Sequence, residues 1–168
     1  ARCQDLGVAD RDYFQRLRDH PDDPVRLYGP VPSRTDGRPA LLLARALRLT
    51  DGRFAGVAVA VLPMERLRPL VAAANLGPGG SVSLRTAELV TILRQPEFTG
   101  PDADAAARRI SDTLRSAIVA SPVEGVYTAV IPSDGIERLA MYRRLERYPL
   151  YWFEGRAIGD ILADSRIQ

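Results

Sequence analysis

Few residues of this 168-residue chain carry side chains suited to catalysis or metal binding. With one cysteine, Cys3, and one histidine, His20, the chain can form neither an internal disulfide nor a histidine-rich metal site. The segment at 77–80 lacks the spacing of a nucleotide-binding loop, and no nucleophile-elbow or zinc motif occurs. Asp102 and Asp104 lack the glycine and distal glutamate of a calcium loop and fit a helix start better. We therefore predict no enzymatic activity, no metal and no cofactor in this chain.

The charged residues are numerous but balanced. The 23 basic residues, all arginines, are interleaved with 21 acidic ones, and the net charge is +2. The densest basic group, with two tyrosines among it, consists of Arg138, Arg143, Arg144, Arg147, Tyr142 and Tyr148. A basic, aromatic sheet surface is one way to bind single-stranded nucleic acid. The two-residue period of a strand, however, splits this group between two faces, so we predict a solvated face and no nucleic-acid partner.

The first half of the chain reads as a helix followed by strands. Asp10 is a candidate N-cap for a helix that Pro21 stops. Two prolines make the segment at 25–33 an edge strand. Further elements expected in this half are a hairpin of strands at 40–49 and 54–62 around an Asp51-Gly52 turn, then a helix from Pro63 to Gly77.

The second half repeats that order. The elements expected are one or two strands at 81–95, one helix at 102–121, strands at 125–131, 136–145 and 150–156, and a last helix from Ile158. An Asp134-Gly135 turn joins the first two of the three later strands. The glycines at 77–80 predict a boundary, which divides the chain into residues 1–77 and 78–168.

The strand at 54–62 has faces of unequal size. Ala58 and Ala60 lie on one face, and Val57, Val59 and Val61 lie on the other. The small alanines predict space above their face of the sheet, to be filled by a neighbouring helix or by a ligand.

Residues 10–84, beginning "DRDYF", and residues 121–162, beginning "SPVEGVYTAV", are similar to the double Cache sensor domains of bacterial membrane receptors. These are paired PAS-like modules outside the cytoplasm, ahead of diguanylate cyclase, histidine kinase or chemoreceptor output domains. The resemblance implies an α+β fold of two tandem modules, each an antiparallel sheet flanked by helices. Family members begin with a long helix and two strands before the segment matching "DRDYF", so we expect the first, membrane-distal module to be incomplete at its N-terminus.

The resemblance also implies a binding site. Family pockets in the distal module commonly use an arginine and aromatics in the segment matching "DRDYF" and an aromatic on the strand matching "VRLYGPV", which nominates Arg11, Tyr13 and Tyr28. Core packing of Tyr13 and a solvated Arg11 are the open alternatives. Arg45 interrupts an apolar strand and is a fourth candidate, although strand periodicity favours an outward position. Relatives that sense amino acids hold the ammonium with an acid where this chain has residues 61–63, all apolar, which favours an organic acid or similar anion as ligand.

The expected function is therefore extracytoplasmic ligand sensing within a transmembrane receptor. The resemblance implies a periplasmic portion of an inner-membrane protein, with homodimerisation and membrane contact through segments outside this chain. No apolar run here approaches the length of a membrane span. The alternative is a soluble PAS-like binding or scaffolding protein without a small-molecule ligand.

Overall fold

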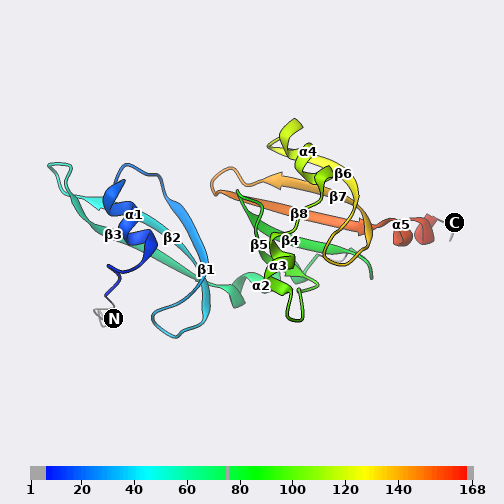
Figure 1. Ribbon diagram of the computed structural model, residues 1–168, viewed down its shortest axis with the longest axis horizontal. Coiled ribbons are helices and arrows are strands. Elements are labelled where there is room, and N and C mark those ends of the chain that lie inside the picture. The colour runs from blue at the N-terminus through cyan, green and yellow to red at the C-terminus, as the bar shows by residue number, and fades with distance from the viewer. Residues whose placement is uncertain (1–6, 75, 166–168) are drawn as a thin grey trace. The chain divides into compact units, whose positions relative to one another are not determined.

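The computed structural model describes residues 7–74 and 76–165, so Cys3 lies outside the described part. The chain divides into two compact units, Ala1–Arg66 and Leu67–Gln168. Each contains an antiparallel sheet with helices packed on it, as Figure 1 shows. The predicted α+β class is confirmed at this level. Within the described residues, no helix is both long enough and apolar enough to span a membrane.

Unit 1 is built on a three-stranded meander. Its elements are α1 (Asp12–Asp19), β1 (Arg26–Pro32), β2 (Pro39–Arg48) and β3 (Phe54–Pro63), and α2 (Met64–Ala72) begins where β3 ends. The sheet order is β1-β2-β3, which makes β1 an edge strand as its prolines predict. Gly52 sits at a φ of +83° in the turn between β2 and β3, a conformation that glycine adopts without strain.

The core of unit 1 lies between α1 and one face of this sheet. Leu17 from α1 is fully buried and belongs to a cluster with Leu42, Ala44 and Ala46 of β2, against which Val57 and Val59 of β3 pack. The expectation that the alanine face of β3 receives the helix is therefore wrong. Ala58 and Ala60 are exposed, because the larger valines bury more apolar area against α1.

The start of α1 also differs from the prediction. Arg11, with extended backbone, occupies the N-cap position, and no side chain caps the helix there. Asp10 is ion-paired with Arg34 from the β1–β2 turn instead. Once its carboxylate is engaged by a guanidinium, Asp10 no longer needs a backbone N–H as a partner.

Unit 2 contains a five-stranded sheet. Its strands are β4 (Ser81–Thr86), β5 (Thr91–Gln95), β6 (Glu124–Val130), β7 (Glu137–Arg144) and β8 (Leu150–Ala157), in the order β5-β4-β8-β7-β6. The chain ends in α5 (Ile158–Ser165), which follows β8 directly. Because β8 lies between β7 and β4, the last strand of this meander is central, whereas β3 pairs only with β2 among the described strands.

The single helix predicted at 102–121 is wrong. The segment forms two helices, α3 (Ala103–Arg108) and α4 (Asp112–Ala120), separated by three residues. Ser111 explains the break, since its hydroxyl accepts a hydrogen bond of 3.1 Å from the Leu114 N–H and caps a new helix. The new axis lets Leu114 reach the aromatic core formed with Tyr142, Tyr151 and Phe153.

A hydrogen bond from Tyr142 of β7 to the end of α4 holds this core together, and a glycine on the neighbouring strand makes room for it. The Tyr142 hydroxyl donates to a backbone carbonyl of α4 or of the residue after it, with Ala117 O at 2.8 Å and Ser121 O at 2.6 Å. A Cβ on Gly125, the neighbour of Tyr142 in the sheet, would lie 2.5 Å from this hydroxyl. Glycine at position 125 is therefore what allows Tyr142 to reach α4.

Candidate functional site

Unit 1 contains a pocket of about 220 Å³ on the face of the sheet that α1 packs against. Leu42 of β2 and Val59 and Val61 of β3 form an apolar floor. These three residues share a sheet face because Leu42 is paired with Val61 and the side chains alternate along each strand. The polar residues of the rim come from two other places, the start of α1 and the β1–β2 turn.

The rim carries two positive charges. Arg11, at the start of α1, donates to the Pro32 carbonyl oxygen at 3.2 Å. Arg34, in the β1–β2 turn, is ion-paired with Asp10. Both arginines line the pocket, and no acidic residue is among its described lining residues. The rim therefore favours an anionic group over a cationic one.

Tyr13 connects the rim to the core. It lines the pocket and is 8 % exposed. Burial raises the pKa of its hydroxyl, and the positive charges of Arg11 and Arg34 only partly offset that effect. Tyr13 is thus a neutral hydrogen-bond donor at ordinary pH, and it serves the core and the pocket at once.

Tyr28 lies behind Tyr13 and does not line the pocket. Their ring centroids are 5.8 Å apart. The Tyr28 hydroxyl is buried and has no hydrogen-bond partner among the residues that the structure describes. Burial also raises the pKa of this hydroxyl. The structure therefore brings Tyr28 next to Tyr13, as a support for the pocket wall.

Arg45 is not brought to this pocket. It is exposed on β2, between the buried Ala44 and Ala46, whose side chains face α1. Alternation along the strand directs Arg45 to the opposite face. The structure thus gathers Arg11 and Tyr13, places Tyr28 behind them, and leaves Arg45 in solvent.

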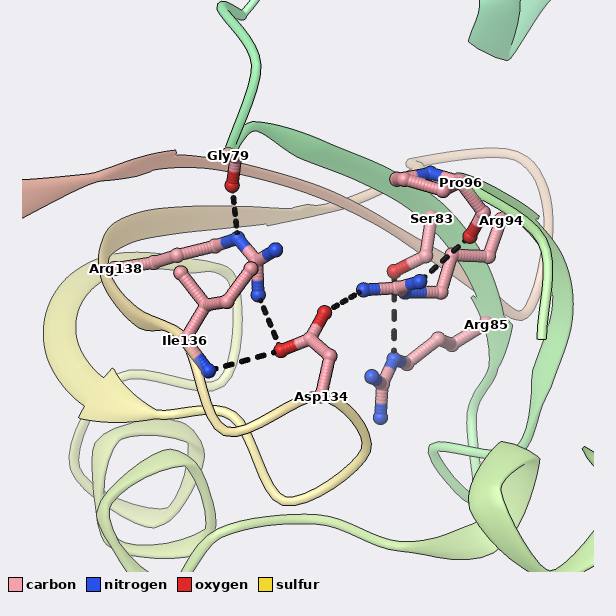
Figure 2. A network of polar contacts seen from close by, with 8 residues as sticks. All are labelled: Gly79, Ser83, Arg85, Arg94, Pro96, Asp134, Ile136 and Arg138. Atoms are coloured by element: carbon pink, nitrogen blue, oxygen red, sulfur yellow. Dashed lines mark hydrogen bonds and ion pairs between the residues drawn. The ribbon is translucent and has the colours of Figure 1, made fainter. Parts of the chain in front are cut away.

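A second concentration of charge lies inside unit 2 and is shown in Figure 2. Arg138 of β7 is 1 % exposed, so the prediction that it belongs to a solvated face is wrong. Its Nε donates to the Gly79 carbonyl oxygen at 2.7 Å, and a terminal nitrogen donates to Asp134 at 2.8 Å. Arg94 of β5 donates to the other oxygen of Asp134 at 2.5 Å and to the Pro96 carbonyl oxygen at 2.6 Å.

Asp134 is held as a carboxylate by this network. Burial acts to raise its pKa, but hydrogen bonds from Arg138, from the Ile136 N–H and from Arg94, together with the charge of Arg138, outweigh burial. The pKa of Asp134 therefore lies below its ordinary value of 3.8. Two buried guanidinium groups share this single acid.

Sequence reasoning missed these buried arginines for an identifiable reason. Arg138, Ala140 and Tyr142 alternate along β7 and all face inward. Periodicity predicted that these residues share a face but not that this face is buried. A solvated face was expected because arginine is rarely fully buried unless it is paired. The available signal was Asp134 four residues before Arg138, across the Asp-Gly turn.

The second half of the chain carries the decisive similarity. The dCache_1-like family, described as a histidine kinase sensor domain, matches residues 64–154, more than half of the chain. The chain belongs to this family. The resemblance seen in the sequence is thereby confirmed. The members of this family are sensor domains, with a ligand-binding and non-catalytic role. No curated protein matches the chain.

Solved structures of sensor domains share the fold of this dCache_1-like chain. The extracellular domain of rpHK1S-Z16, described as a histidine kinase, is 34 % identical over 92 % of this chain and 62 % of its own, with a TM-score of 0.75. The ligand-binding domain of the Pseudomonas aeruginosa amino acid chemoreceptor PctB in complex with L-Arg is 15 % identical over 97 % of this chain and 66 % of its own, at 0.64. The ligand-binding domain of Mlp24 with asparagine is 14 % identical over 97 % and 62 %, at 0.59. This chain thus spans about three fifths of the first of these domains.

Proposed function

We propose that this chain is the extracytoplasmic ligand-sensing part of a bacterial transmembrane receptor and that its unit 1 pocket binds a small carboxylate or similar organic anion. Arg11 and Arg34 are the charged residues of the described pocket lining, and they stand over an apolar floor. A guanidinium offers a planar pair of donors that matches a carboxylate. The volume of about 220 Å³ lies below the roughly 300–1,000 Å³ of drug-sized sites, so the ligand is small.

An amino acid fits this pocket less well. PctB and Mlp24 carry arginine and asparagine in their structures, and such ligands bring an ammonium group as well as a carboxylate. No acid is among the described lining residues, and Asp10, which precedes Arg11, is already paired with Arg34. A buried ammonium without an acidic partner is costly. The anionic group alone is therefore the better match.

A relay to α5 completes the proposal. Within unit 2, Gly79 accepts from Arg138 and donates its N–H to Asp160 of α5 at 2.8 Å. These contacts tie the segment that follows α2 to the last helix. A ligand that favours one arrangement of the pocket would bias α5 by at most its difference in affinity between the two states. The coupling between the pocket and α5 is what the family resemblance implies.

The finer assignments belong to the same proposal. The two units act as paired PAS-like modules, with the first one incomplete in this chain. The parent protein lies in an inner membrane and carries a histidine kinase output; a diguanylate cyclase output and a homodimer stay predictions. Support for the kinase output comes from the family description and from rpHK1S-Z16.

The experiment compares ligands that differ only in the ammonium group. Thermal unfolding and titration calorimetry of the chain with 3-methylbutanoate and with valine should show binding of the acid and at least ten-fold weaker binding of the amino acid. Arg11→Ala should reduce binding of the acid at least ten-fold, and Arg45→Ala is the matched control with no effect. Tighter binding of valine, or an Arg11→Ala protein that binds normally, would refute the proposed ligand class or the proposed site.

A further inference from the structure

Arg85 of β4 differs from the other buried arginines in having no acidic partner. It is 8 % exposed, and no carboxylate among the described residues lies within 4.0 Å of it. Its hydrogen bonds to the Ser83 hydroxyl, at 3.5 Å, and to the Leu89 carbonyl oxygen, at 3.4 Å, are long. Its guanidinium stacks 5.0 Å from the centre of the Phe153 ring, and its second terminal nitrogen donates to none of the described residues.

No nearby acid is available to take the role of partner. Both oxygens of Asp134 are used by Arg94 and Arg138, and Figure 2 draws no contact between Asp134 and Arg85. Glu154 of β8 accepts from the Trp152 indole, two residues away on the same strand, and alternation separates both from Phe153. Of these three buried guanidinium groups, two share the carboxylate of Asp134 and the third, that of Arg85, has no carboxylate among the described residues.

Neutral donors surround the same guanidinium. Thr91 of β5 is the register partner of Arg85, and its hydroxyl is buried without a hydrogen-bond partner among the described residues. Tyr127 of β6 packs against the aromatic cluster that contains Phe153, the ring on which Arg85 stacks. Burial raises the pKa of Tyr127, and the charge of Arg85 lowers it in part. A cation, an unpaired hydroxyl and a protonated phenol thus converge on one region of the sheet face.

We propose that Arg85 is the anchor of a second ligand site, in unit 2, for a small carboxylate that accepts hydrogen bonds from its guanidinium and from Thr91. A buried charge without a counter-ion is unfavourable, and an anion with two oxygens removes that cost. The aromatic face of Phe153 holds the guanidinium flat and presents its edge to the ligand. This site shares no described residue with the unit 1 pocket, so it can exist whether or not that pocket binds anything.

The test uses Arg85→Met, which keeps the length of the side chain and removes its charge. The probes are acetate, propionate and succinate, measured by calorimetry and by thermal unfolding at pH 7. We expect at least one to bind, Arg85→Met to weaken it at least ten-fold, and the unliganded variant to melt at the same or a higher temperature because an unpaired buried cation is gone. Arg45→Ala, which changes an exposed arginine outside both sites, should leave this binding unchanged.

Each contrary outcome overturns the proposal. One such outcome is an Arg85→Met protein that binds the probe as before, and another is a wild-type chain that binds none of the three probes. A third is a lower melting temperature of Arg85→Met together with unchanged binding, which would assign Arg85 a structural role alone. Loss in Arg11→Ala with retention in Arg85→Met would leave the proposed function standing and remove the second site. If Arg85→Met does not fold, Thr91→Val tests the site instead. We expect it to bind the probe with three- to ten-fold weaker affinity, and an unchanged affinity would refute the proposal.

Discussion

Each unit contains a helix followed by three consecutive strands, but the two units differ in how they place charge. In unit 1, pairs such as Arg34–Asp10 and Arg38–Glu65 are exposed, and the arginines at the pocket stand at its rim. In unit 2, Arg94 and Arg138 have side chains 7 % and 1 % exposed and share Asp134 beneath a loop. The position of the last strand explains part of the difference. β8 pairs with β4, and β5 lies beyond β4, so β8 is a central strand. β3 pairs only with β2 in the described residues.

This contrast shows that unit 2 buries arginine in two places: on two strands for which unit 1 shows no counterpart among its described residues, and on β7 next to the turn that carries Asp134. Arg94 comes from β5 and Arg85 from β4, the two strands for which unit 1 shows no counterpart among its described residues. Exposed ion pairs contribute little to stability, while a broken buried pair is expensive. The two units should therefore respond very differently to equivalent substitutions.

The largest expected difference concerns the acids. Asp134→Ala should lower the free energy of unfolding by about 3–5 kcal/mol, because it leaves two buried guanidinium groups without their carboxylate. Asp10→Ala, the matched change in unit 1, should cost less than about 1 kcal/mol. Urea unfolding monitored by circular dichroism measures both. Equal losses for the two variants would show that the burial difference has no energetic consequence.

Part of the pH dependence of stability should come from the same acid, although the pKa values of Asp19, Asp23 and Asp51 are lowered as well. The folded pKa of Asp134 is below its unfolded value, so the folded state releases this proton more readily than the unfolded state does. Its contribution is present above about pH 4 and is lost as the pH falls through the folded pKa. Melting temperatures between pH 2 and 7 should fall on the acid side less steeply for Asp134→Asn. An unchanged acid slope would contradict the assignment.

Two tyrosines provide a smaller, matched comparison. Tyr142→Phe should cost about 1–3 kcal/mol, since the carbonyl that accepts its hydroxyl at the end of α4 loses a buried donor. Tyr28→Phe in unit 1 removes a hydroxyl that has no described partner, so it should be neutral within about 0.5 kcal/mol or slightly stabilising. Urea unfolding of both variants tests this, and a costly Tyr28→Phe would reveal a partner that these contacts do not include.

The smallest effect is at the break between α3 and α4. Ser111→Ala should destabilise the protein by about 1 kcal/mol through loss of the cap on Leu114 N–H. Ser111→Asp should keep the stability, because aspartate also caps helices well. Thermal unfolding distinguishes the two variants. If both behave as wild type, the cap does not define the start of α4.

Local chemistry was enough to predict most elements of this fold. Pro30 and Pro32 marked the edge strand β1, and the Asp51-Gly52 and Asp134-Gly135 turns marked two hairpins, because these residues restrict or free the backbone on their own. The break at Ser111 was missed because a serine inside a helical pattern becomes a cap only when packing favours a new axis. In the site, Arg11 and Tyr13 came from the family resemblance, whereas Arg85 and Arg94 had no local signal.

By itself the sequence determined the strand and helix order, the positions of the turns and the family, because each depends on neighbouring residues or on a pattern along the chain. Only the tertiary structure decided which sheet face is inside. It put the valines of β3 under α1, sent Arg45 to solvent and buried Arg138, because alternation defines two faces but only packing against another element chooses between them.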